Sequence, residues 1–152
     1  MKVWIPLAVI VLVFCGCIAQ EKFTLTDIIF CAGEPADRSY DQKRDPTYVQ
    51  GETVWIYLEA FKFDTREEGY FYMMSFDYTL EVYDEQGNYL LGGPDHIEES
   101  SSEDPVYVWF RFWIETSGFE EGAYTVKIVM TDTFSEQSAT SEGTFYLVEA
   151  GS

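Results

Sequence analysis

The stretch that decides the fold is FEEGAYTVKIVMTD, residues 119–132. A turn, Glu-Glu-Gly-Ala, is followed by an alternation in which Tyr124, Val126, Ile128 and Met130 occupy every second position. This two-residue period predicts a β-strand with one buried face. The other apolar segments of the chain are then expected to supply the partners of this strand.

The same period recurs along most of the chain. Further strands are predicted at residues 23–31, 53–63, 70–83, 89–91, 106–115 and 139–148. Segment 32–50 is a long charged connection, expected to cover part of a sheet and to add a short edge strand. Segment 92–105, GGPDHIEESSSEDP, is predicted to be a polar loop. Because no segment shows a helical period, we expect one all-β domain over residues 23–150, an antiparallel β-sandwich of about seven to eight strands.

The turn before the deciding strand adds a family resemblance. Gly122 and Tyr124 in EEGAY look like the tyrosine corner that precedes the penultimate strand of immunoglobulin-like and fibronectin-III-like domains. The resemblance implies that the Tyr124 hydroxyl bonds to the backbone a few residues upstream. The inter-sheet cysteine pair of antibody domains is missing, so the resemblance implies the broad architecture and leaves function open.

The N-terminus has the pattern of a secretory signal. Lys2 is followed by an apolar run over residues 3–14 and by small residues around Gly16. Gly16-Cys17 resembles the lipobox of prokaryotic lipoproteins, and Gly-Cys-Ile is similar to archaeal secreted lipoproteins. The resemblance implies that residues 1–16 are removed and that Cys17 carries the lipid. The lipid and a short tether, residues 17–22, would then anchor the domain to the outer face of the cytoplasmic membrane, in the cell envelope. Plain signal cleavage and an uncleaved N-terminal anchor are the alternatives.

The charge of the chain narrows the classes of partner. With 27 acidic and 9 basic residues the net charge is -18, and cleavage before Cys17 would remove Lys2 alone, giving -18 - 1 = -19. Such a surface repels phosphate backbones, so nucleic acid is excluded as a partner. The expected partners are the membrane, through the lipid, and an envelope protein or polysaccharide. Cys31 follows an apolar run and is predicted to be a buried, inert thiol.

Catalysis has little support in the sequence. His96, the one histidine, lies in the polar segment 92–105 without a nucleophile motif beside it, so we predict a non-enzyme without a cofactor. The acidic side chains of the same region are hard oxygen ligands that suit calcium, but the D-x-D-x-D-G spacing is absent and no specific metal is predicted. These weak metal candidates are Asp95, Glu98, Glu99, Glu103 and Asp104.

Aromatic side chains form the strongest signal outside the core. They lie on two predicted strands at the positions that face away from the core, and they are Trp55, Tyr57, Tyr107, Trp109 and Trp113. Exposed aromatic rings stack on sugars or dock proteins; the alternative is that segment 32–50 covers them. The sequence therefore predicts a membrane-anchored, extracytoplasmic, non-enzymatic binding module. The alternatives are a carbohydrate-binding module that uses these rings, and a small inhibitor-like or accessory domain that engages through segment 92–105.

Overall fold

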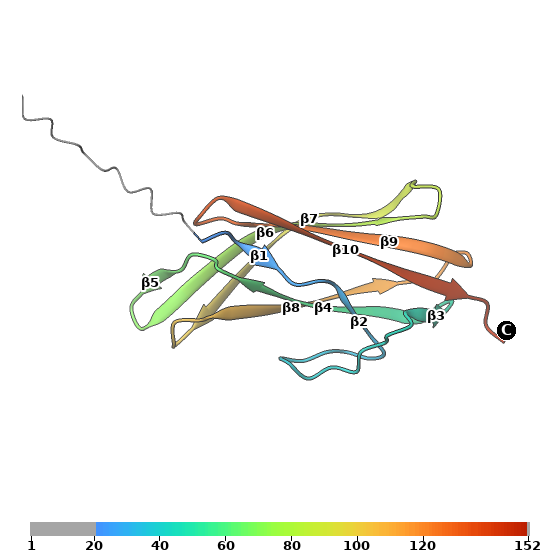
Figure 1. The fold of residues 1–152 in the computed structure, drawn as a ribbon, viewed down its shortest axis with the longest axis horizontal. Coiled ribbons are helices and arrows are strands. Elements are labelled where there is room, and N and C mark those ends of the chain that lie inside the picture. The colour runs from blue at the N-terminus through green and yellow to red at the C-terminus, as the bar shows by residue number, and fades with distance from the viewer. Residues whose placement is uncertain (1–20, 152) are drawn as a thin grey trace, which may run out of the picture.

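The chain folds into two β-sheets packed face to face (Figure 1). The computed structural model describes residues 21–151, and every regular element within them is a strand. The predicted all-β sandwich is confirmed, with ten strands rather than seven or eight. Within residues 21–151, no helix is long and apolar enough to cross a membrane. The predicted signal (1–16), Cys17 and most of the tether lie outside the described residues.

The smaller sheet is built around β4 (Thr53–Phe61). On one side β4 pairs with β8 (Tyr107–Glu115), and on the other side it pairs with two short strands, β1 (Thr24–Leu25) and β2 (Ile29–Cys31). The single strand predicted at 23–31 is therefore interrupted in the middle, and both halves stay on the same edge of β4.

The larger sheet contains the deciding strand at its centre. Its strands are β3 (Thr47–Val49), β10 (Gln137–Val148), β9 (Gly122–Asp132), β6 (Phe71–Tyr83), β5 (Arg66–Glu68) and β7 (Tyr89–Ser101). β9 lies between β10 and β6, and β7 forms the far edge beyond β6. β3 is the short edge strand expected within segment 32–50, and it runs parallel to β10.

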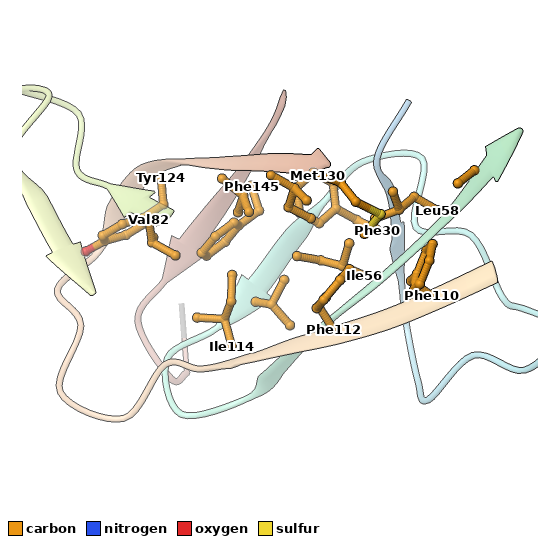
Figure 2. Close-up of a cluster of buried hydrophobic side chains, with 14 of the residues drawn as sticks. Phe30, Ile56, Leu58, Val82, Phe110, Phe112, Ile114, Tyr124, Met130 and Phe145 are labelled. Atoms are coloured by element: carbon orange, nitrogen blue, oxygen red, sulfur yellow. The ribbon is translucent and has the colours of Figure 1, made fainter. Parts of the chain in front are cut away.

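The core fills the space between the two sheets, as the alternation predicted. The inward side chains of β9 and β4 are buried, and Figure 2 shows Ile56, Phe112 and Phe145 pointing into the space between the sheets. A fully buried side chain of this size contributes about 1.5–3 kcal/mol. Cys31 is also fully buried. Burial raises the pKa of its thiol to about 11, with a further contribution from Asp41, so the thiolate is scarce at neutral pH.

The tyrosine corner is formed as the resemblance implied. The Tyr124 hydroxyl donates a hydrogen bond to the Glu120 carbonyl oxygen at 2.7 Å, and its ring stacks on Phe145 at 5.4 Å. Gly122, the first residue of β9, has φ +144°, a conformation that favours glycine. The turn and the ring together fix where β9 enters the sheet.

The predicted polar loop at 92–105 is wrong, because most of it belongs to β7, which pairs with β6 as far as Ser101. Its inward positions include Gly93, Asp95 and Glu99, so no hydrophobic alternation marks it as a strand. The β6 backbone still supplies hydrogen-bond partners for it. Gly92 makes this pairing close: a Cβ there would lie 2.0 Å from the Leu80 carbonyl oxygen.

Candidate functional site

The aromatic face predicted from the sequence lies on the outer side of the smaller sheet. On this face Trp55 lies opposite Trp113, and Tyr57 lies opposite Arg111, because β4 and β8 pair in register. Trp109 stacks on Tyr57, with 6.0 Å between ring centroids and 18° between planes. The period of two along each strand therefore gathers the rings as expected.

Part of this face is covered by segment 32–46, which runs across it (Figure 1). Tyr40 packs on Tyr57 with 4.5 Å between ring centroids, and the Arg38 guanidinium lies 3.7 Å from the centre of the Tyr107 ring. The Tyr107 hydroxyl donates to the Asp37 carboxylate at 3.0 Å. Tyr57 is consequently only 1% exposed, so it is unavailable to a ligand. The expected covering role of this segment is confirmed for Tyr57.

A buried carboxylate fastens the covering segment to the sheet. Glu59 accepts two hydrogen bonds from Arg38, at 2.9 Å from Nε and 3.2 Å from Nη2, and a third from the Tyr57 hydroxyl at 2.6 Å. The bonds from Arg38 hold the pKa of Glu59 below its usual range. Burial, followed by the bond to Glu59, raises the pKa of Tyr57. A charge in this position is tolerated because its oxygens are satisfied by these donors.

The exposed end of the aromatic face is Trp113, which is 57% accessible to solvent. Its neighbour Trp55 is partly buried, and the two ring centroids lie 6.0 Å apart with planes tilted by 46°. Tyr107 and Trp109 are also partly buried. The five predicted ligand-binding aromatics therefore share one face but do not form one flat exposed platform.

Beside Trp113, the two sheets leave a groove between β7 and β8. The groove consists of a larger hollow of about 580 Å³ and a smaller hollow of about 390 Å³. The larger hollow is lined by Ile97, Glu99, Val108, Trp109, Phe110 and Arg111. The smaller hollow is lined by Tyr78, Leu80, Gly92, Gly93, Pro94, Asp95, Phe112 and Trp113. The two hollows share no lining residue, but both lie between β7 and β8, one after the other along these strands, and we call the two together the β7–β8 groove.

The groove follows an unpaired strand edge. Within residues 21–151, β8 pairs with no strand except β4, and β7 pairs with none except β6. The backbone groups on the outer edge of each strand are thus open to another chain. Sequence reasoning misses this groove because the residues of β7 lack apolar alternation and so give no signal of a strand.

His96 lies on β7 rather than in a loop, on the face away from the groove. Its Nδ1 lies 2.7 Å from Asp77 Oδ1, and its Nε2 lies 3.5 Å from both Ser75 Oγ and Glu98 Oε1. Asp77, then Glu98, raises the pKa of His96. The order Asp–His–Ser is that of a hydrolase triad. However, Glu98 also approaches Nε2, and Ser75 lies inside strand β6 rather than on a turn that would present backbone N–H groups to an oxyanion.

The predicted metal candidates are spread along and beyond β7. Asp95 and Glu99 face the groove, whereas Glu98 lies on the opposite face, and Glu103 and Asp104 follow the end of the strand. In the described part of the chain, no group of three or more His, Cys, Asp or Glu side chains is arranged to hold a metal ion.

The comparisons with known proteins do not assign a family. No protein-family model and no curated protein matches the chain. One of the matching solved structures is Bacteroides uniformis beta-glucuronidase 2 covalently bound to cyclophellitol-6-carboxylate aziridine, with 9% identity over 81% of this chain and a TM-score of 0.43. The chain spans 14% of the length of that glucuronidase. A likeness of this size carries no argument about function.

Proposed function

We propose that the chain is a non-enzymatic, extracytoplasmic interaction module, anchored to the outer face of the membrane by a lipid on Cys17. The observation that carries the binding role is the β7–β8 groove, which lies along an unpaired strand edge beside the exposed Trp113. A solvent-exposed indole next to a hollow with open backbone groups suits a protein partner, because aromatic anchors dominate such interfaces.

The anchoring role rests on the Gly16-Cys17 sequence. β1 begins at Thr24, seven residues after Cys17, so a fully extended linker would reach about 23–25 Å. The acidic net charge would hold the domain away from an anionic lipid surface within that reach. A lipid on Cys17 would therefore keep the module close to the membrane with its groove open to envelope components.

The anchor is tested by mass spectrometry of the chain from membrane fractions, comparing wild type with Cys17→Ser. We expect added lipid mass on Cys17 in the wild type and release of the Cys17→Ser chain from membranes. An unmodified Cys17 in membrane fractions would contradict the proposal.

The binding role is tested by in-cell photo-crosslinking. A benzophenone amino acid at position 113 is expected to give a discrete protein adduct, whereas the same group at position 146 is expected to give none. Tyr146 is a suitable control because it is also exposed, at 46%, and lies on β10 in the other sheet. Equal adducts at both positions, or none at position 113, would contradict the role.

A carbohydrate-binding module is the second candidate, favoured by the exposure of Trp113 beside Trp55. Its test is quenching of tryptophan fluorescence by a panel of soluble polysaccharides, repeated with Trp113→Ala. Saturable quenching that Trp113→Ala abolishes would select this candidate over a protein partner. The inhibitor-like or accessory alternative would engage through strand β7, which contains most of segment 92–105, rather than through a loop.

A further inference from the structure

The two unpaired edges that border the groove differ in how well they are protected. β7 carries Pro94, which has no N–H to donate, and acidic side chains at Asp95 and Glu99 that point inward. Proline and inward-pointing charges are the devices that prevent an edge strand from pairing. β8, with the sequence YVWFRFWIE, carries no proline or glycine and is nine residues long.

Although β8 lies at the edge of its sheet, its inward side chains are nearly as buried as those of the neighbouring strand β4. Its inward residues Val108, Phe110 and Phe112 are 4–8% exposed, whereas Val54 and Ile56 on the neighbouring β4 are fully buried. Val108 and Phe110 line the larger hollow of the groove, and Phe112 lines the smaller one. A further strand beside β8 would complete the burial of these side chains and satisfy its open backbone groups.

The opposite wall of the groove has a regular chemical pattern. Asp95, Ile97 and Glu99 share one face of β7, with the apolar residue between two carboxylates. Four residues along a strand correspond to about 13 Å, so the two carboxylates are separated by that length. Glu99 lies in the hollow beside Val108–Arg111 and Asp95 in the hollow beside Phe112, so the pattern runs along the β8 edge.

We propose that the groove binds an extended segment of a partner protein as an added strand on β8, and that this segment carries Lys or Arg on both sides of an apolar residue, at spacing basic-x-apolar-x-basic. The basic side chains would face Asp95 and Glu99, and the apolar residue would face Ile97. The alternate side chains would lie on the outer face near Trp109 and Trp113, where β-branched and aromatic residues pair well. The inference rests on the proposed function, since it names the partner class of the same groove.

A second copy of this chain does not fit this pattern. Its net charge of -18 makes two copies repel. Among its nine Lys and Arg residues, the one pair spaced four apart is Lys62 and Arg66, and Asp64 occupies the middle position between them. The complementary sequence therefore has to come from another protein.

The test uses the full-length chain in detergent and a labelled nine-residue peptide, Thr-Val-Lys-Thr-Val-Thr-Lys-Val-Thr, with binding followed by fluorescence anisotropy. Glu99→Gln and Asp95→Asn are each expected to raise the Kd by about two- to fivefold, as expected for a partly exposed ion pair. Glu98→Gln is the matched control, because it removes the same charge from the next residue on the other face of β7. Its Kd is expected to stay within about 1.5-fold of the wild type once salt screens the long-range attraction.

The backbone component of the proposal is tested by N-methylation of alternate peptide residues. Methyl groups on the peptide edge that faces β8 are expected to abolish binding, whereas the other alternate set is expected to leave it intact. Equal losses for Glu98→Gln and Glu99→Gln, indifference to the N-methyl set, no peptide binding, or a dimer that the peptide does not disperse would each overturn the inference. Crosslinking at position 113 without peptide binding would overturn the inference and leave the proposed function standing.

Discussion

Removing one hydroxyl group from the tyrosine corner tests the packing of the strand that decides the fold. Tyr124→Phe deletes the hydrogen bond to the Glu120 carbonyl and leaves the ring in place. The ring keeps its contacts with Phe119, at 5.1 Å, and Phe145, at 5.4 Å between centroids. The substitution therefore isolates the contribution of the bond from that of the apolar packing.

The expected cost follows from the surroundings of that bond. A neutral hydrogen bond contributes about 0.5–1.5 kcal/mol net, and a buried acceptor left without a partner costs more. Glu120 is exposed, so water can reach its carbonyl after the hydroxyl is removed. We therefore expect a loss of about 1 kcal/mol in the free energy of unfolding, which lowers the Tm of a domain this size by about 3–5 °C.

The assay is urea unfolding followed by tryptophan fluorescence, supported by calorimetry. A loss of about 1 kcal/mol lowers the urea midpoint by about 0.3–1 M with the slope unchanged. Tyr78→Phe is the matched control, because the Tyr78 hydroxyl donates to the exposed Asp95 carboxylate at 3.3 Å and its removal is expected to cost less than about 0.5 kcal/mol. A cost for Tyr124→Phe no larger than that for Tyr78→Phe would refute the structural role of the corner.

Two further outcomes follow from the structure. Gly92→Ala is expected to destabilise the domain by about 1–3 kcal/mol more than Gly93→Ala in the same urea assay. The new Cβ at position 92 would meet the Leu80 carbonyl oxygen at 2.0 Å, whereas nothing lies within 4 Å of a Cβ at Gly93. Equal losses of stability for the two variants would contradict the close approach of β7 to β6. Because hydrogen bonds from Arg38 lower the pKa of Glu59 in the folded state below its ordinary value of 4.5, Glu59 contributes stability that is present above that value and is lost as the pH falls through the lower folded pKa. The wild type is therefore expected to lose more stability below about pH 5 than Glu59→Gln does, and parallel pH profiles from urea unfolding at each pH would contradict this.

Strands with one buried face can be predicted from the sequence, because apolar residues at every second position mark the face that is buried. The inward sets of β9 and β4, such as Ile128 and Ile56, follow from alternation alone and are fully buried. The tyrosine corner follows from the motif around Tyr124, because the motif encodes a local hydrogen bond within four residues. Local periodicity and local turns are therefore sufficient to predict which side chains of these strands face the core.

From the sequence, coverage of the aromatic face by segment 32–50 can be predicted only as an alternative to exposed aromatic rings. Tyr57 alternates as an outward residue, and its burial comes from Arg38 and Tyr40, which are distant in sequence and belong to a segment without periodicity. Nothing in the residues of β4 alone distinguishes an exposed Tyr57 from a covered one. The sequence evidence for coverage is limited to the charged and aromatic side chains of the covering segment. These residues indicate coverage only once the structure shows that Arg38 pairs with Glu59.

The failure to predict β7 has a physical cause that also locates the groove. A strand shows hydrophobic alternation when another layer lies across from its inward face. The inward positions of β7 alternate only in part, because Leu91 and Ile97 pack against the core whereas Asp95 and Glu99 border the groove. In this chain, the strand with the weakest alternation is the one that borders the groove. The segment whose sequence does not predict a strand is therefore the one that faces the proposed partner strand. That partner would pair with β8, whose side chains alternate regularly between the core and the outer face.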